Sequence, residues 1–440
     1  MTAVALDLHG TVAAATSTGG WVALTPAGAL DKVRGVLSLS DVEAARQRLS
    51  KAIYATPCAY SETLSRLTGS RTFVKLENLQ MTGSFKERGA ANKLLTLSDV
   101  ERRRGVVAAS AGNHGLAVAF HCQRLGIRSL IVMPEWAPLI KVTSARYHEA
   151  EVVLDGANYD EAYAHARKIE AERGLTFVHP FDDPQVIAGQ GTLGLELLEQ
   201  CPDLDAVVVP VGGGGLIAGV ALAIKAKNPR VSVIGVQAEE IAAMKASLGG
   251  GKRLRLPAAA SIADGIAVRE VGELTFELVK KHVDAVVTVK EEEIANAILL
   301  LLEIEKTVVE GAGATTLAAL VNRKVALGGK TVALVLSGGN IDVNVIARII
   351  ERGLVKDGRL VRFSVPLQDR PGALARLTAL IAEARANVLH ISHDRAFSHA
   401  RIGETEVEVT LETSGREQIE VVRRHLSDAG YQVREVDARP

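Results

Sequence analysis

The sequence is poor in cysteine and aromatic residues, carries no net charge and contains no long apolar run. Its three cysteines, Cys58, Cys122 and Cys201, are far apart and lack CxxC spacing. This usage is typical of reduced cysteines in a cytosolic protein rather than of a disulfide framework or a zinc site. Lys and Arg, 51 in total, balance 51 Asp and Glu, so charge indicates neither a nucleic-acid partner nor an acidic membrane surface. Without an apolar run of about 18 residues, no membrane span is predicted.

The chain is long: its 440 residues are enough for two or three domains and a large buried core. Residues 1–37 are rich in Ala, Thr and Gly, and Asp7 together with the lack of basic residues at the start argues against a secretory signal. We expect a poorly ordered extension there. We expect the main domain over residues 38–352, a linker over 353–359 and a second domain over 360–440.

Short apolar strands alternate with segments of helical period through the main domain, which predicts an α/β fold with parallel sheets covered on both faces. The 40 glycines fit the tight turns of such a fold. Because the strands group before and after a loop-rich region around Gly249–Asp264, we expect two open lobes with a cleft between them. The predicted strands are Thr72–Leu76, Val106–Ala109, Ser129–Met133, Glu151–Leu154, Phe177–His179, Ala206–Val211, Val231–Val236 and Thr331–Leu336.

The second domain has a different order of elements and follows a connector at Gly353–Gly358. Its pattern predicts β-α-β-β-α-β, the ferredoxin-like arrangement, with a loop through Ser398 between the two central strands. In chain order, we place the elements at Leu360–Pro366, Gly372–Ala384, Asn387–His393, Glu406–Glu412, Glu417–Ala429 and Gln432–Val436.

Lys86 is at an unusual position for a solvent-exposed lysine. In the motif GSFKERGA (residues 83–90) it comes directly before a helix-forming run, so it lies in the first turn of a predicted helix. The positive end of the helix dipole disfavours an ammonium there. The amine is then easier to deprotonate, as a Schiff-base lysine must be. A lone lysine is usually an ordinary surface residue, but three further motifs favour the chemical interpretation.

The second motif is SAGNHG (residues 110–115), directly after the predicted strand Val106–Ala109. A strand that opens through small residues onto a helix presents unpaired backbone N–H groups, which suit a carboxylate. Asn113 adds an amide donor at the end of the strand, where open α/β sheets place ligands. A tight turn capped by Asn113 or His114 explains the motif equally well, and we interpret His114 as structural rather than catalytic.

The third motif consists of four glycines, residues 212–215, between the strand Ala206–Val211 and a helix. Their backbone amides are free to wrap one small tetrahedral anion. The motif lacks the lysine and hydroxyl of a nucleoside-triphosphate loop. No acidic residue that could hold a ribose ends the next strand. One phosphate monoester therefore fits better than a dinucleotide.

The fourth motif, SGGN (residues 337–340), follows the strand Thr331–Leu336, and Ser337 would bring a neutral hydroxyl into the cleft unless it only caps a helix. A Schiff-base lysine, a phosphate cradle, an asparagine and a hydroxyl match the aldehyde, phosphate, ring oxygen and ring nitrogen of pyridoxal 5′-phosphate. From about Ser38 to the C-terminus the chain resembles the fold-type II pyridoxal-phosphate enzymes. Within them it is most similar to threonine dehydratases (threonine ammonia-lyases) with a single regulatory domain. The motifs SFKERGA, SAGNHG, GGGGL and SGGN carry this resemblance.

The resemblance implies a role for each motif. Lys86 would bind the aldehyde of the cofactor and serve as the catalytic base, while Phe85 would pack against the ring. Asn113 would bond the ring hydroxyl and Ser337 would face the ring nitrogen. Glu310 would lie near the ring, with a surface glutamate at a helix start as the alternative. The phosphate would be held by Gly212, Gly213, Gly214, Gly215 and Leu216, and the substrate carboxylate by Ser110, Ala111, Gly112, Asn113 and His114.

The implied activity is deamination of L-threonine to 2-oxobutanoate and ammonia, by loss of water and then hydrolysis, with L-serine as a second substrate. A preference for serine or a 3-hydroxyaspartate, and a non-catalytic regulator that binds amino acids, are the alternatives. Related serine racemases carry a second serine in the carboxylate loop, where Ala111 stands here, so racemisation is disfavoured. Gln237 replaces a glutamate that binds a divalent cation in those racemases, and we therefore expect no metal site.

The second domain resembles the ACT regulatory domain, which binds amino acids where two such domains pair. Pro371 pre-sets a helix start and Gly372 lets the backbone come close to a ligand. The resemblance implies an amino-acid effector, such as isoleucine or valine, that shifts a conformational equilibrium, and a homodimer or homotetramer. A domain that only dimerises is the alternative. We expect the effector near Asn387–Ile391 and near Asp369, Arg370, Pro371, Gly372 and Leu374.

Overall fold

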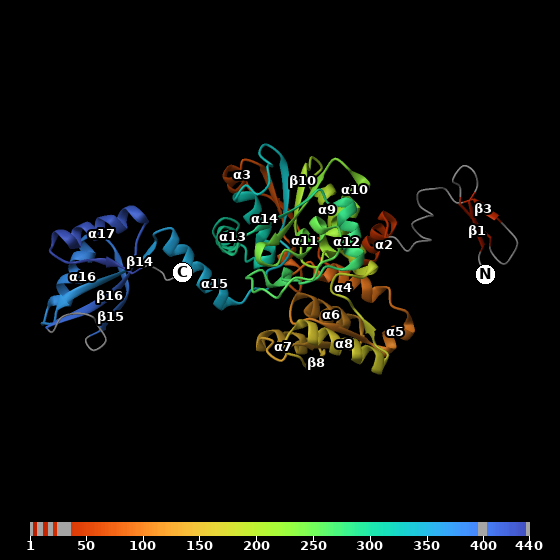
Figure 1. The fold of residues 1–440 in the computed structure, drawn as a ribbon, viewed down its shortest axis with the longest axis horizontal. Helices are drawn as coiled ribbons and strands as arrows, with labels where there is room; N and C mark the ends of the chain where they lie inside the picture. The colour runs from red at the N-terminus through yellow and green to blue at the C-terminus, as the bar shows by residue number, and fades with distance from the viewer. Residues whose placement is uncertain (1–2, 7–11, 16–20, 24–36, 395–402, 437–440) are drawn as a thin grey trace. The chain divides into compact units, whose positions relative to one another are not determined.

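The computed structural model describes residues 3–6, 12–15, 21–23, 37–394 and 403–436, and the chain divides into two compact units, Met1–Ile341 and Asp342–Pro440 (Figure 1). Within the predicted extension, the described residues form a three-stranded antiparallel sheet of β1 (Ala3–Leu6), β2 (Val12–Ala15) and β3 (Trp21–Ala23). The rest of residues 1–36 and the loop through Ser398 lie outside the described residues.

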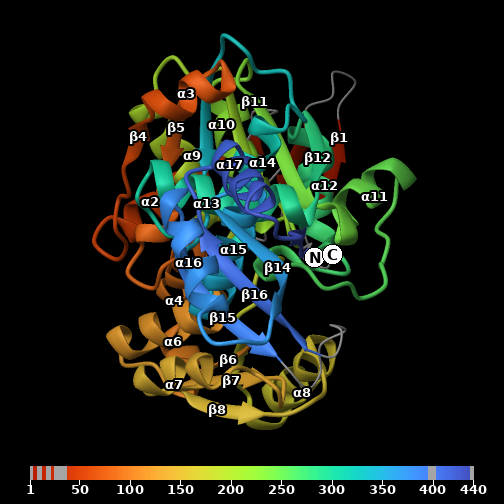
Figure 2. The same cartoon turned by 90° about the vertical axis from the view of Figure 1, so that its left-hand side faces the viewer.

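The first unit also contains two larger sheets, each of which forms one lobe. A six-stranded sheet in the order β12-β11-β10-β13-β5-β4 forms the large lobe, and its neighbours are parallel except for the edge strand β4. A four-stranded parallel sheet in the order β8-β7-β6-β9 forms the small lobe, with α6, α7 and α8 around it (Figure 1, Figure 2). The strands are β4 (Cys58–Tyr60), β5 (Arg71–Lys75), β6 (Val106–Ala109), β7 (Ser129–Met133), β8 (Glu151–Leu154), β9 (Thr176–Phe177), β10 (Ala206–Pro210), β11 (Ser232–Ala238), β12 (Ala285–Val289) and β13 (Thr331–Val335).

The prediction of two parallel-sheet lobes is confirmed, but its division of the chain is wrong. The small lobe is inserted between β5 and β10, and the chain then returns to the large lobe, where β13 pairs with β5. Strands on both sides of residues 249–264 therefore share one sheet. The strands β4 and β12, which form the two edges of this sheet, were not predicted; β4 is only three residues long, and β12 was missed although its sequence is apolar.

The helices that cover these sheets begin at recognisable caps. Asp183, for example, accepts hydrogen bonds from the backbone N–H groups of Gln185 and Val186, and Pro184 occupies the first position of helix α9. No helix in the described part of the chain could span a membrane. The α-helices of this unit are α2 (Leu39–Leu49), α3 (Glu62–Thr68), α4 (Lys86–Leu95), α5 (Asp99–Arg104), α6 (Asn113–Leu125), α7 (Leu139–Tyr147), α8 (Tyr159–Arg173), α9 (Pro184–Gln200), α10 (Gly215–Lys227), α11 (Ala243–Gly250), α12 (Glu273–His282), α13 (Glu291–Ile304) and α14 (Gly311–Val321), and the 3-10 helices are η1 (Glu77–Leu79), η2 (Glu239–Ile241) and η3 (Asp264–Ile266).

The second unit confirms the predicted β-α-β-β-α-β order, with an antiparallel sheet β15-β16-β14-β17. Its core includes Phe363, Leu377 and Val409. The expected connector begins inside a helix, because α15 runs to Lys356, and the division between the units falls after Ile341. The elements are α15 (Val343–Lys356), β14 (Leu360–Gln368), α16 (Ala373–Glu383), β15 (Asn387–Asp394), β16 (Glu404–Glu412), α17 (Arg416–Asp428) and β17 (Arg434–Glu435).

Candidate active site

Lys86 is the first residue of α4, so the predicted place at a helix start is confirmed. Its Nζ donates a hydrogen bond of 2.8 Å to the carbonyl oxygen of Pro180 and lies 5.2 Å from the ring centroid of Phe85. Burial lowers the pKa of Lys86 to about 8, against the opposing attraction of the Glu310 carboxylate. Removal from water is therefore the main reason why this amine is easy to deprotonate.

Glu310 lies inside the same site, and the alternative of a surface glutamate is wrong. It precedes helix α14 as its N-cap, and it is only 3% exposed. The side-chain amide of Asn113 donates to both carboxylate oxygens, at 2.9 and 3.0 Å. Burial raises the pKa of Glu310 to about 7, although the hydrogen bonds from Asn113 oppose this. The carboxyl group is thus half-titrated near neutral pH, close enough to Lys86 to influence its charge.

Asn340 completes this cluster. It is the last residue of the SGGN motif, and no role was predicted for it from the sequence. Its Nδ2 donates to the Oδ1 of Asn113 at 2.8 Å and to the carbonyl oxygen of Thr82 at 2.8 Å. The amide of Asn113 therefore has one orientation, in which Oδ1 faces Asn340 and Nδ2 faces Glu310. The end of β6 in the small lobe and the end of β13 in the large lobe meet through these side chains.

The glycine loop, residues 212–215, joins β10 to α10 and has no room for side chains. A Cβ on Gly213 would lie 2.5 Å from ring atoms of Phe181, and Gly214 has φ +97°, a conformation that favours glycine. Thr275 holds the loop by donating from Oγ1 to the carbonyl oxygen of Gly213 at 2.7 Å. Within the described residues, the amides of the first three glycines donate to no backbone carbonyl. These N–H groups at the start of α10 are available to an anion.

The loop between β6 and α6 contains the five residues expected to receive a carboxylate. Ser110 accepts a hydrogen bond of 3.2 Å from the amide of Gly112, and both residues are partly exposed, as are Ala111 and Asn113. His114 differs, because it is buried and its Nε2 lies 2.8 Å from the carbonyl oxygen of Val178. Burial lowers its pKa to about 3, so the ring is neutral. Its ring is thus engaged in packing, which agrees with a structural role.

Three other sequence-derived residues are buried. Ser337 follows β13, is 1% exposed and accepts a hydrogen bond of 3.0 Å through its carbonyl oxygen from the amide of Phe85, next to Lys86. Leu216 is also buried, and its side chain is part of the hydrophobic core of the large lobe. Gln237 bonds the carbonyl oxygen of Val211 and the amide of Lys245, at 3.1 and 2.9 Å. Within the described ranges, no group of three or more His, Cys, Asp or Glu residues could hold a metal ion.

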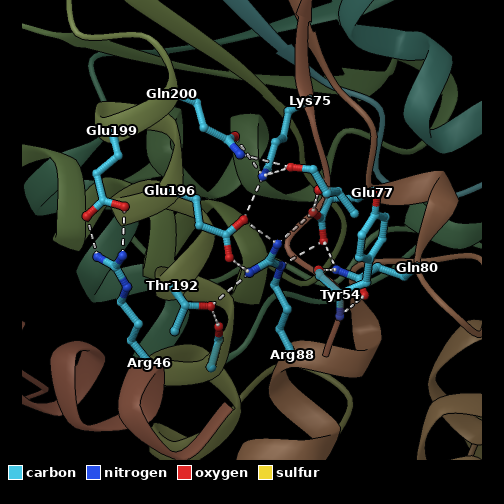
Figure 3. Close-up of polar contacts among 12 residues, drawn as sticks. Arg46, Tyr54, Lys75, Glu77, Gln80, Arg88, Thr192, Glu196, Glu199 and Gln200 are labelled. Carbon is cyan, nitrogen blue, oxygen red and sulfur yellow. Dashed lines mark hydrogen bonds and ion pairs between the residues drawn. The ribbon is translucent and has the colours of Figure 1, made fainter. Parts of the chain in front are cut away.

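A buried charge network anchors α4 two residues beyond Lys86 (Figure 3). The guanidinium of Arg88 is fully buried and donates to both oxygens of Glu77, at 2.7 Å each, and to both oxygens of Glu196, at 2.6 and 2.8 Å. Lys75 of β5 shares Glu196 at 2.6 Å. The network joins β5, η1, α4 and α9, so it fixes the helix that presents Lys86. The sequence alone does not reveal which carboxylates pair with Arg88.

Two family models match the chain. Residues 49–338 match the model described as pyridoxal-phosphate dependent enzyme, and residues 361–428 match the ACT domain. The chain belongs to the pyridoxal-phosphate dependent enzymes. The predicted cofactor and the predicted ACT domain are thereby confirmed.

Several known proteins are similar to this pyridoxal-phosphate enzyme over most of its length. The L-threonine ammonia-lyase of Thermotoga maritima is 53% identical over 399 residues, which are 91% of this chain and 99% of the relative. The crystal structure of a T.th. threonine deaminase is 44% identical, with a TM-score of 0.66, and the match covers 69% of this chain and 99% of the other. A serine racemase from Dictyostelium discoideum is 37% identical, with a TM-score of 0.66 over 70% of this chain and 99% of the other.

The residues of the site fit pyridoxal phosphate. An aldehyde needs an amine that can lose its proton, and burial gives Lys86 a pKa of about 8. A phosphate needs several N–H donors, and the glycine loop offers amides without backbone partners in the described part of the chain. The ring needs polar neighbours, and Asn113 and Ser337 stand at the ends of β6 and β13. All of these groups lie at carboxyl ends of parallel strands or at helix starts, where α/β folds bind ligands.

Proposed function

We propose that this enzyme deaminates L-threonine to 2-oxobutanoate and ammonia and that it also accepts L-serine. The observation that carries the proposal is the 53% identity to an L-threonine ammonia-lyase over nearly the full length of both chains. The site supports it, because it combines one buried amine, an anion cradle and a carboxylate-binding loop. Loss of water from a β-hydroxy amino acid uses each of these three parts.

We assign the proton transfer at the substrate to Lys86. Pyridoxal phosphate supplies an electron sink for the negative charge that develops on the α-carbon when its proton leaves. The Nζ of Lys86 would hold the cofactor and, once released from it, would take the α-proton of the substrate. A pKa of about 8 places this amine close to neutral pH, where a general base works best.

The remaining residues bind and orient. We assign the phosphate to the backbone amides of residues 212–216 and the substrate carboxylate to the loop at residues 110–113. The Nδ2 of Asn113, oriented by the bond from Asn340 to its Oδ1, would donate to the ring hydroxyl and would share its two protons between that oxygen and Glu310. Ser337 would bring a neutral hydroxyl toward the ring nitrogen and, unlike a carboxylate, would not hold a proton there. A ring nitrogen without a proton favours elimination over transamination.

Racemisation of serine is the second candidate, because the chain is similar to a serine racemase. A racemase needs a second acid or base on the opposite face of the α-carbon. Ala111 leaves the carboxylate loop without a hydroxyl at the position where the racemases carry a serine. The Ala111→Ser variant is the matched test, and it should raise D-serine formation above the level of the unchanged enzyme.

The test follows keto-acid release by the purified enzyme from L-threonine and L-serine, with D-serine measured in parallel. We expect 2-oxobutanoate from L-threonine and little D-serine. Enzyme that contains the cofactor and releases no keto acid from either substrate would contradict the proposal. Faster D-serine formation than pyruvate release would support the racemase instead.

The role of Lys86 has a direct chemical test. Borohydride reduction of the holoenzyme followed by peptide mapping should place the pyridoxyl group on Lys86. The Lys86→Ala variant should lose the near-visible absorbance and nearly all turnover. Lys93→Ala is the control, because Lys93 lies in the same helix but is paired with Asp183 at 2.6 Å. A pyridoxyl group on another lysine would refute the assignment.

We further propose that an amino acid, such as isoleucine or valine, binds the ACT domain and changes the activity of the enzyme. Of the expected residues, 369–372 form the exposed turn between β14 and α16, where Gly372 has φ +86°, and Leu374 lies in the first turn of α16. Calorimetric titration of the full chain with each amino acid, alongside activity, tests this. If no branched-chain amino acid gives a heat of binding or changes the activity, the proposal is wrong.

We also propose that the enzyme is a cytosolic homodimer or homotetramer. Three free cysteines suit a reducing compartment, and paired ACT domains require at least two chains. Light scattering of the purified holoenzyme gives the mass of the assembly, and a monomer at micromolar concentration would contradict the proposal.

A further inference from the structure

Two cysteines that are far apart in the sequence face each other in the large lobe. The Sγ atoms of Cys58 and Cys201 lie 3.2 Å apart, although 143 positions separate the residues. Cys58 begins β4 and is half-buried, whereas Cys201 caps the C-terminal end of α9 and is buried. A sulfur–sulfur bond is about 2.05 Å long. The two thiols therefore need to approach by only roughly 1 Å to be joined.

The surroundings give the two sulfurs different acidities. The hydrogen bond between them lowers the pKa of Cys201, and the positive charges of Lys75 and Arg71 lower it further. The same hydrogen bond, together with burial, raises the pKa of Cys58. These directions favour the thiolate at Cys201, although burial opposes this, and either sulfur can donate in the hydrogen bond between them. A thiolate beside a thiol is the arrangement from which disulfides form.

We propose that Cys58 and Cys201 are a reversible oxidation site, at which a hydroperoxide converts the two thiols into an intramolecular disulfide. The thiolate sulfur of Cys201 attacks one oxygen of hydrogen peroxide, the O–O bond breaks, and a sulfenic acid and one water form after proton uptake. The sulfur of Cys58 then attacks the Cys201 sulfur, the S–O bond breaks, and the hydroxide leaves as a second water with the proton of Cys58. Two thiols are oxidised by two electrons, and one peroxide is reduced to two waters.

The bond would reinforce a contact close to the network that anchors α4. Cys58 lies opposite Lys75 in the β4–β5 pair, and the Nζ of Lys75 also donates to Gln200 at 3.0 Å, one residue before Cys201. A disulfide would thus tie β4 covalently to the end of α9. Because it closes a long loop in the unfolded chain, we expect the oxidised enzyme to melt at a higher temperature than the reduced enzyme.

The experiment uses the purified holoenzyme, first reduced and then treated with hydrogen peroxide. Remaining thiols are alkylated under denaturing conditions, and peptides are identified by mass spectrometry without reduction. We expect the Cys58 and Cys201 peptides to appear joined and two hydrogens lighter than the reduced pair, in most molecules. Cys122 should stay alkylatable, because it is buried alone in α6 and serves as the internal comparison. A thiol reductant should restore both free peptides and the original melting temperature.

Matched variants separate the pair from general oxidation. Cys201→Ser should abolish both the joined peptide and the rise in melting temperature, and Cys58→Ser should do the same but leave a sulfenic acid on Cys201 that dimedone captures. Cys122→Ala keeps both sulfurs of the pair and should give the joined peptide as the unchanged enzyme does. The proposal is overturned if Cys58 and Cys201 remain separately alkylatable after peroxide, or if the only joined peptides link two different chains.

Discussion

Arg88 and the exposed Arg46 both bond carboxylates of helix α9. Removing the charge of Arg88 should destabilise the first unit far more than removing the charge of Arg46. The Arg88→Met change keeps much of the side-chain volume, but leaves the carboxylates of Glu77 and Glu196 without their main cation. Glu77 is fully buried, and breaking a buried ion pair typically costs about 3–5 kcal/mol. Arg46 also makes two hydrogen bonds to α9, through Glu199, but both side chains are about half exposed. Arg46→Met should therefore cost at most about 1 kcal/mol.

The assay must follow the first unit alone, because a chain with two units need not unfold in one step. Hydrogen exchange read by mass spectrometry gives the opening free energy of peptides from α4 and α9, with peptides from α16 as the reference. In the Arg88→Met background, a further Glu77→Gln change should recover part of the loss, because a neutral amide is cheaper to bury than a carboxylate. Equal losses for Arg88→Met and Arg46→Met, or no recovery with Glu77→Gln, would refute the reasoning.

Three further predictions concern the site itself. In the cofactor-free enzyme the pKa of Glu310 is raised from 4.5 to about 7, so the folded state holds this proton more tightly than the unfolded state does. The free energy of unfolding should therefore fall by roughly 3 kcal/mol as the pH rises between these two values. Denaturant titrations of the Glu310→Gln variant should lack this fall. Gly213→Ala forces a methyl group against Phe181 and should weaken pyridoxal-phosphate binding at least tenfold in equilibrium dialysis, whereas Gly249→Ala, with open space around it, should not. Asn340→Ala removes one hydrogen bond that orients Asn113 and should weaken cofactor binding roughly tenfold, by about 1.4 kcal/mol; unchanged affinity would contradict that role.

Local patterns predicted the elements of this fold better than their assembly. The strand Val106–Ala109 and the order of the second unit were recognised because apolar runs and turn residues are adjacent in sequence. The grouping into lobes failed because β5 pairs with β13 across about 260 residues, and no periodic pattern reports which distant strands become neighbours. The edge strand β12 was missed although its sequence is apolar, whereas β8, also an edge strand, was predicted, so the position at an edge does not explain the omission.

The same limit applies to the site. Lys86 and the glycine loop were found because each motif carries its own chemistry within a few residues. The contacts of Asn113 with Glu310 and Asn340 bridge 197 and 227 positions, and those of Arg88 with Glu196 bridge 108. A sequence without its fold shows none of these distances. The burial that moves the pKa values of Lys86 and Glu310 is likewise a property of the assembled lobes.

Burial moves the two ionisable groups of the site in opposite directions, and the attraction of the Glu310 carboxylate limits the fall of the Lys86 pKa. It lowers the pKa of Lys86 to about 8 and raises that of Glu310 to about 7, so each group comes close to neutral pH. Near pH 7.5 the ammonium and the carboxylate are both still largely charged, and each makes the charge on the other cheaper. When the amine gives up its charge to bind a carbonyl group, Glu310 loses this nearby cation, which favours the protonated form of its carboxyl group. The carboxyl group then takes up a proton and no buried carboxylate is left without a cation. Proton uptake at Glu310 thus follows from the loss of charge at Lys86.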